Sequence, residues 1–148
     1  MARWTAPAVL TLALALAGCG GGGVSAGATV AVYVAPSLCR EARGVASAAQ
    51  GRSDLETRIV CLPAAEAGGG TALAVAGRNA RRATEDSTAV AFLEAPGPTA
   101  KFTRSIVEAA GVAWVEATSG RSAMRSVIAA LDERGSASPR SAVLDQVG

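Results

Sequence analysis

Short apolar runs rich in valine and alanine recur along the chain and alternate with segments of a different pattern. These runs cover residues 29–35, 56–62, 88–93 and 112–117. Prolines follow the first two runs directly, at Pro36 and Pro63. Apolar runs of this length that end at turn-forming residues predict β-strands. We therefore expect four short strands.

The segments that follow each run predict helices, because their apolar residues return every three or four positions. The expected helices cover residues 38–49, 71–86, 99–110 and 120–134, with a last short helix that Ser138 and Pro139 begin. Inward-facing residues are expected to be Leu73, Ala76, Ala80 and Ala83 in the second helix, and Phe102 and Ile106 in the third. Gly111 and Gly135 are expected to end the third and fourth helices, since glycine readily adopts the left-handed cap conformation.

Strands that alternate with helices predict βαβ units with right-handed crossovers and a parallel sheet covered on both faces. We expect an α/β fold with a single small doubly wound sheet of about four strands and flavodoxin-like layering. Residues 29–148, including a C-terminal helical hairpin, have room for one such lobe. Ligands of these sheets bind beyond the carboxyl ends of the strands, where the strand order reverses.

The first 18 residues have the pattern of a signal peptide: Arg3 precedes an uncharged Leu- and Ala-rich run at 6–17. As a helix this run is only about 18 Å long, and a bilayer core is roughly 30 Å thick. The run ends in Leu-Ala-Gly-Cys19, which resembles the lipobox of bacterial lipoprotein precursors. This resemblance implies cleavage before Cys19, lipidation of Cys19 and anchoring on the extracytoplasmic face of the cell membrane. The alternative is an ordinary secretory signal with Cys19 incidental.

Residues 19–28 are expected to form a flexible tether, because the glycine run 20–23 has no side chains to bury. Without residues 1–18 the chain carries 13 basic and 12 acidic residues, since Arg3 is one of the 14 in the full sequence. This balance and the few aromatic residues argue against nucleic-acid binding.

Catalytic chemistry has little support in the sequence. The chain contains no histidine, which removes the commonest general base and metal ligand, and it has no phosphate-binding loop or nucleophile elbow. We therefore expect no enzyme activity, no metal site and no cofactor. Cys39 and Cys61 remain after the lipidation site, and export would allow a disulfide between them; two buried free thiols are the alternative.

Residues 79–96 and the following segment to Val112 resemble the second helix, third strand and third helix of type 1 periplasmic binding proteins, closest to the branched-chain amino acid group. The resemblance is weaker over residues 30–63. It implies a substrate-binding component of an ABC importer, a permease partner and a small amino-acid-like ligand. Positions that match ligand-contacting loops of the family are Ser37, Thr99, Thr118 and Ser119.

The chain departs from this family in length, because members close two lobes around the ligand and this sequence has material for one lobe. Residues 122–131 and 140–145 resemble helices near the carboxyl end of full-length members, so the sequence reads as an internally shortened relative. Pro96, Gly97 and Pro98 stand where members often place serines. The alternative function is a non-catalytic interaction lipoprotein that has lost ligand binding and meets a protein partner or a second copy of itself.

Overall fold

The computed structural model describes residues 27–64 and 69–148. Within these residues four strands alternate with helices, and a fifth helix follows at the C-terminus. The strands are β1 (Ala28–Val34), β2 (Leu55–Cys61), β3 (Ala89–Glu94) and β4 (Ala113–Glu116). The helices are α1 (Pro36–Ala49), α2 (Gly69–Glu85), α3 (Ala100–Ala109), α4 (Gly120–Asp132) and α5 (Pro139–Val147). Each expected strand and helix is present, with ends shifted by a few residues.

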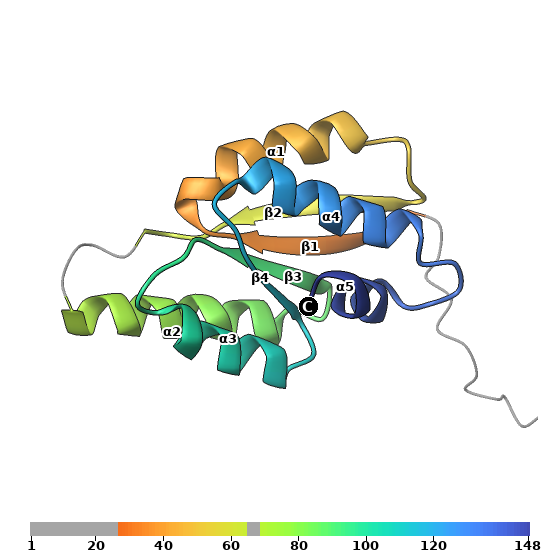
Figure 1. Cartoon of the computed structure of the whole chain (residues 1–148). Helices are drawn as coiled ribbons and strands as arrows, with labels where there is room; N and C mark the ends of the chain where they lie inside the picture. The colour runs from red at the N-terminus through yellow and green to blue at the C-terminus, as the bar shows by residue number, and fades with distance from the viewer. Residues whose placement is uncertain (1–26, 65–68) are drawn as a thin grey trace, which may run out of the picture.

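The four strands form one parallel sheet in the order β2-β1-β3-β4. The chain moves outward from β1 to β2, then crosses back to β3 and continues to β4, so the strand order reverses between β1 and β3. Helices cover both faces of the sheet (Figure 1): α1, α4 and α5 lie on one face, and α2 and α3 on the other. The predicted α/β fold with a small doubly wound sheet is confirmed.

Two apolar cores fill the spaces between the sheet and its helices. Alternate residues of β1 point to opposite faces, as the period of a strand requires. Val30, Val32 and Val34 pack against α1, α4 and α5, whereas Ala31 and Tyr33 pack against α2 and α3. Because β1 is central and buried on both faces, its sequence is a continuous apolar run.

Several helix ends follow the sequence signals. Gly111, two residues after α3 ends, and Gly135, three residues after α4 ends, have positive φ values of 70° and 56°, which L-residues with a side chain rarely adopt. Ser119 and Ser138 precede α4 and α5, and their hydroxyl oxygens accept hydrogen bonds from the backbone amides of Ser122 and Ser141. The predicted cap at Ser138 is confirmed.

Two inward-facing assignments are wrong. Leu73 is 46% exposed and Phe102 is 39% exposed. Leu73 lies near the start of α2, and this end of the helix extends past the sheet (Figure 1). In α3 the sheet-facing positions are taken by Ala100, Thr103 and Val107. Phe102 therefore lies on the flank of α3, close to Gly77 of α2.

The starts of α1 and α4 pack in close contact at the carboxyl edge of the sheet. A β-carbon on Gly120 would overlap the carbonyl group of Leu38, 2.9 Å from its carbonyl carbon. Ser119 donates a hydrogen bond to Oε2 of Glu41 at 2.9 Å, and the backbone amide of Arg121 donates to the same atom at 3.1 Å. Glycine at position 120 thus lets two helices from distant parts of the chain meet.

The predicted signal peptide, the lipidation site Cys19 and most of the predicted tether lie outside the described residues. The first described strand begins at Ala28, close to the predicted start of the lobe. Across residues 27–64 and 69–148, no helix has both the length and the apolar character needed to cross a bilayer.

Candidate functional site

The reversal of strand order between β1 and β3 creates a crevice at the carboxyl edge of the sheet. The chain leaves β1 at Ala35 toward α1 on one face, and it leaves β3 at Glu94 toward α3 on the other. The two connections therefore diverge directly after the strand ends, where the amide of Ala35 donates to the carbonyl oxygen of Leu93 at 2.8 Å. This geometry predicts a ligand site at these strand ends.

A pocket of about 260 Å³ lies at this edge, on the side of α2. It is lined by Ala35, Pro36, Leu62, Pro63, Ala72, Val75, Ala76, Asn79, Phe92, Glu94, Pro98 and Thr99. Most of these residues are apolar, and the polar side chains are those of Asn79, Glu94 and Thr99. Largely apolar walls with a few placed polar groups are typical of small-molecule sites.

Among the residues that the structure describes, Glu94 is the only ionisable one that lines this pocket. Its Oε2 accepts a hydrogen bond from the indole Nε1 of Trp114 at 3.0 Å. Its Oε1 lies 3.3 Å from the hydroxyl of Thr103, which is fully buried, and 3.5 Å from the hydroxyl of Thr99. These neighbouring groups hold the carboxylate in one orientation at the end of β3.

Trp114 is itself held in place from its other side. The guanidinium carbon of Arg104 lies 5.3 Å from the centre of the indole ring, within the range of a cation–π contact. Nε of Arg104 also donates to Glu108 at 2.9 Å, one helical turn along α3. The chain Glu108–Arg104–Trp114–Glu94 thus extends from the surface of α3 to the pocket.

The other polar groups of the pocket lie on different elements. The side-chain amide of Asn79, on α2, donates to the carbonyl oxygen of Pro63 at 3.3 Å, which fixes its orientation. Thr99 precedes α3, and its hydroxyl makes no capping hydrogen bond to that helix. The first turn of α3 therefore lacks this side-chain cap, and helix N-termini attract negative charge. A carboxylate and a helix N-terminus face one pocket.

Of the four sequence-predicted ligand residues, Thr99 alone lines the pocket. Ser37 is an exposed residue in the first turn of α1, and Thr118 is an exposed residue in the connection from β4 to α4. Ser119 caps α4 and binds Glu41 on α1, so its hydroxyl is already used. The structure does not bring these three residues together with Thr99 around the pocket, because α4 starts on the opposite face of the sheet.

Glu94 and Asn79 were not among the predicted ligand residues. A signal for Glu94 was available, since a single acidic residue directly follows the buried apolar run 88–93 at the carboxyl end of a predicted strand. Asn79 carries no comparable signal. It lies among the arginines of a predicted helix, and its approach to the strand ends depends on the angle at which α2 crosses the sheet.

Cys39 and Cys61 lie next to each other at the carboxyl end of β2. Their Cα atoms are 5.6 Å apart, a separation typical of disulfides, and their sulfur atoms are at bonding distance. Cys39 lies in the first turn of α1 and Cys61 is the last residue of β2. A disulfide here would hold α1 against the strand end that precedes the pocket residues Leu62 and Pro63.

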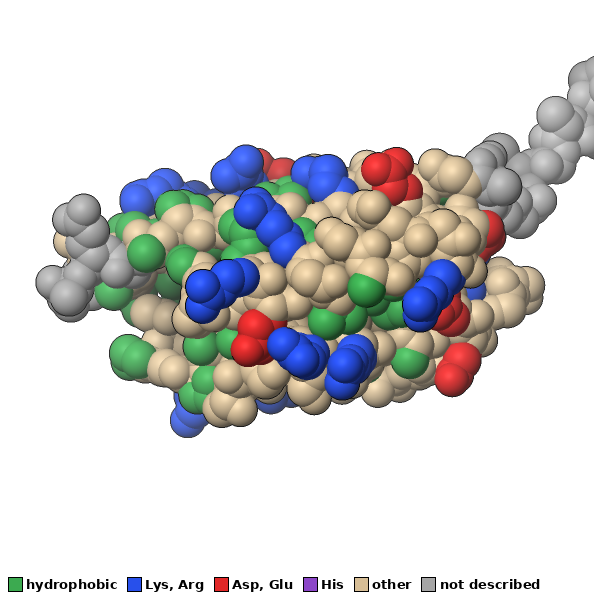
Figure 2. Space-filling view, turned by 90° about the horizontal axis from the view of Figure 1, so that it is seen from above, with side chains coloured by type: hydrophobic (Ala, Val, Ile, Leu, Met, Phe, Trp, Pro, Cys, Tyr) green, Lys and Arg blue, Asp and Glu red, His purple; other side chains and the backbone are tan. Residues whose placement is uncertain are grey.

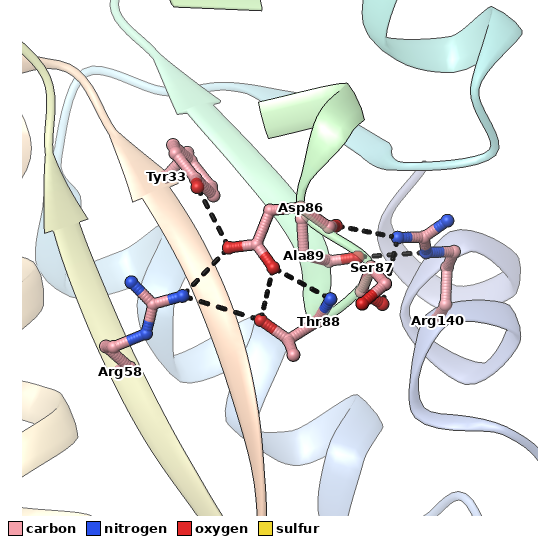
Figure 3. A network of polar contacts seen from close by, with 7 residues as sticks. All are labelled: Tyr33, Arg58, Asp86, Ser87, Thr88, Ala89 and Arg140. Carbon is pink, nitrogen blue, oxygen red and sulfur yellow. Dashed lines mark hydrogen bonds and ion pairs between the residues drawn. The ribbon is translucent and has the colours of Figure 1, made fainter. Parts of the chain in front are cut away.

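A second polar cluster lies at the opposite, amino edge of β3 (Figure 3). Asp86 accepts hydrogen bonds from the hydroxyl of Tyr33 at 2.9 Å, from Arg58 at 2.8 Å, and from the amide and hydroxyl of Thr88 at 2.9 and 2.6 Å. Arg140 of α5 donates to the backbone carbonyl groups of residues 86, 87 and 89. These bonds join β1, β2, β3 and α5.

The electrostatics of this cluster favour a charged Asp86. Partial burial by itself would raise the pKa of Asp86, but the hydrogen bonds from Thr88, Tyr33 and Arg58 outweigh it and lower the pKa to about 2. Burial, and then the hydrogen bond and charge of Asp86, raise the pKa of Tyr33. The hydrogen bonds of the cluster connect three strands and a helix to one another, which is a structural role.

In residues 27–64 and 69–148, no group of three or more Cys, Asp or Glu side chains is placed to hold a metal ion. Comparisons of the sequence with protein-family models and with curated proteins, and of the chain with solved structures, found no match.

Proposed function

We propose that this chain is a membrane-anchored extracytoplasmic lipoprotein that acts as a substrate-binding-protein-like component of an ABC importer. It binds a small polar ligand such as an amino acid and has no catalytic step. The observation that carries this proposal is the pocket of about 260 Å³ at the carboxyl ends of β1 and β3, with Glu94 in its wall. Cys19, with its lipobox-like context, supplies the anchor.

The polar groups of the pocket suit a zwitterion with an apolar side chain. A ligand ammonium group would bind the carboxylate of Glu94, which Trp114 and Thr103 orient. A ligand carboxylate would lie at the first turn of α3, next to Thr99, where backbone amides and the helix dipole favour negative charge. Leu62, Val75 and Phe92 would contact an aliphatic side chain.

A single lobe limits the expected affinity. Two-lobed binding proteins enclose their ligand by hinge closure, and this chain supplies one wall of such a site. Each pair of charged groups at a partly open pocket contributes little free energy, since water screens it. We therefore expect dissociation constants in the range of about 0.1 to 1 mM for the isolated lobe.

Calorimetry of residues 24–148, which include every described strand and helix, tests this proposal against a panel of amino acids. Binding of an aliphatic amino acid is expected, and Glu94→Gln should weaken it about tenfold because the ammonium loses its counter-charge. Glu56→Gln is the matched control, since Glu56 is an exposed carboxylate on β2, away from the pocket. No heat with any ligand at millimolar concentration, or equal affinity of the Glu94→Gln and Glu56→Gln variants, would contradict the proposal.

The second candidate function is a non-catalytic interaction lipoprotein, and one observation favours it. Two large apolar side chains, Leu73 and Phe102, are exposed on the neighbouring helices α2 and α3. Such side chains are typical of contact surfaces when they lie close together. Sedimentation equilibrium would detect self-association. A strict monomer, together with no crosslink from position 73 to a membrane protein in cells, would exclude this candidate.

A further inference from the structure

A second and larger concavity lies on the other side of the sheet from α2, whose residues line the pocket at the strand ends. It is a groove of about 880 Å³ between α1 and α4. Both helices cover the same face of the sheet, and the groove lies on their solvent-exposed side. The groove is lined by Arg40, Glu41, Gly44, Val45, Ala48, Ala49, Arg52, Arg121, Arg125, Ile128, Ala129 and Asp132. None of these residues lines the pocket that contains Glu94.

The packing of α1 and α4 explains the shape of this groove. The residues of α1 that line it recur at helical spacing from position 40 to position 49, and those of α4 recur in the same way from 121 to 132. Arg52, which follows the end of α1, completes the lining. The groove therefore extends along roughly 14 Å of α1 and roughly 17 Å of α4. Small residues keep it open, because Gly44, Ala48 and Ala129 have no side-chain atoms beyond Cβ.

The floor of the groove is apolar. Val45 and Ile128 are partly exposed there, although each also packs against the buried core beneath. Gly44, Ala48 and Ala129 are exposed between them. An apolar strip that lies between two helices and stays open to water is a favourable surface for one more helix, which would bury it.

The rim of the groove is basic. Arg40, Arg52, Arg121 and Arg125 are all exposed, and none makes a salt bridge in the part of the chain that the structure describes. Of the two acidic residues at the groove, Glu41 already accepts hydrogen bonds from Ser119 and from the Arg121 amide. Figure 2 shows this face of the molecule, with basic side chains around apolar ones.

From this arrangement we propose that the groove docks an acidic amphipathic helix of a protein partner. The apolar face of that helix would lie on Val45, Ile128 and the small residues between them, and its carboxylates would meet the arginines of the rim. Arginine suits this role because its guanidinium group binds carboxylates with two parallel hydrogen bonds.

Charge and shape argue against three other occupants of the groove: the N-terminal residues of this chain, a second copy of it and a bilayer surface. The 26 residues before the described part contain no Asp or Glu, so they cannot neutralise the rim. A second copy that used the same face would bring arginines against arginines. A bilayer surface is broad. It would contact the arginines of the rim but would not enter the narrow groove between α1 and α4. The acidic helix alone satisfies both the apolar floor and the basic rim.

The test uses the full chain in nanodiscs of neutral phosphatidylcholine and a stapled helical peptide of about four turns as the probe. The peptide carries leucines at positions i, i+4, i+7 and i+11, with glutamates on both flanks. A second peptide has lysine in place of each glutamate. Fluorescence anisotropy measures the affinity of both, and binding to empty discs is subtracted.

We expect the glutamate peptide to bind at least about tenfold more tightly than the lysine peptide, with an affinity that falls as salt is added. Reversing one charge on each helix, in the double variant Arg40→Glu and Arg125→Glu, should weaken binding by about tenfold or more. The matched control is Arg78→Glu with Arg81→Glu, which makes the same change of net charge on α2 and should leave the affinity unchanged. Thermal unfolding verifies that both variants are folded.

Equal affinity for both peptides would overturn the proposal, and so would equal loss of affinity in the two double variants. It would also be overturned if the glutamate peptide failed to bind while vesicles with anionic phosphatidylglycerol captured the chain, because the arginines would then serve a membrane surface. The chain could also dimerise, with the dimer lost in the double variant Arg40→Glu and Arg125→Glu. That result would overturn the proposal and assign the face to a second copy. None of these results depends on the amino-acid titration, so the two proposals fail separately.

Discussion

The hydroxyl of Tyr33, on the central strand, donates a hydrogen bond of 2.9 Å to the carboxylate of Asp86, which precedes β3. Asp86 lies 53 residues farther along the chain. The bond joins the buried centre of the sheet to the loop through which α2 leads into β3, and Arg58 and Thr88 complete the cluster (Figure 3). Two predictions depend on this contact.

The pKa of Tyr33 should lie above its ordinary value in the folded protein. Burial and the adjacent Asp86 carboxylate both disfavour the phenolate. Tyr33 is the only tyrosine in the sequence, so an absorbance titration reports on it directly. Asp86→Ala should lower the pKa of Tyr33, and Asp145→Ala, at an exposed position of α5, should not change it. Identical titration curves for the two variants would contradict this account.

Asp86 should make the stability of the protein sensitive to acid. Its pKa is lowered in the folded state from 3.8 to about 2, so its contribution is present above pH 3.8 and is lost as the pH falls through about 2. Asp86→Asn should reduce the free energy of unfolding at neutral pH by on the order of 1 to 2 kcal/mol. Denaturant titrations at several pH values should show this difference shrink toward pH 2. A difference independent of pH would contradict the prediction.

Gly120→Ala should destabilise the fold by about 1 to 3 kcal/mol, because the new methyl group would overlap the carbonyl of Leu38. Gly44→Ala is the matched control, since a β-carbon at that position of α1 meets no atom within 4 Å. Alanine there should stabilise the helix by about 0.5 to 1 kcal/mol. Thermal or urea unfolding of both variants provides the measurement. Shifts of the same sign would show that the contact between α1 and α4 is not tight.

Cys39 and Cys61 should form a disulfide when the chain folds under oxidising conditions, and the bond should contribute about 3 kcal/mol for a sequence separation of 22 residues. Peptide masses before and after reduction would identify the bond. Reductant should lower the urea midpoint of the wild type and leave that of the Cys39→Ala, Cys61→Ala double variant unchanged. Alkylation of both cysteines in the unreduced, denatured chain would show free thiols.

Cys19→Ser should release the chain from the membrane fraction, because it removes the sulfur that carries the diacylglyceryl group of a lipoprotein. The measurement is fractionation followed by the mass of the N-terminal peptide, which should carry acyl chains in the wild type only. Ser25→Ala, a change of similar size in the same stretch, serves as the control. Unchanged membrane association of the Cys19→Ser variant would show that the signal is an ordinary secretory one.

The sequence by itself determined the fold class and the order of its elements. Short apolar runs and helical patterns depend on neighbouring residues, so they could be read without knowing the partners of each segment. The left-handed glycines at positions 111 and 135 and the serine cap at position 138 are local in the same sense. The export signal at Cys19 is likewise local, and it remains a prediction.

Only the tertiary structure decided which residues line each concave surface. The exposure of Leu73 and Phe102 depends on how far α2 extends past the sheet and on how α3 is rotated against α2. Asn79 and Glu94 meet at one pocket, and Thr99 joins them while Ser37, Thr118 and Ser119 do not. The groove of arginines between α1 and α4 joins residues that are about 80 positions apart in the chain. Such placements depend on helix crossing angles and on close contacts such as that of Gly120 with Leu38, which no local pattern specifies.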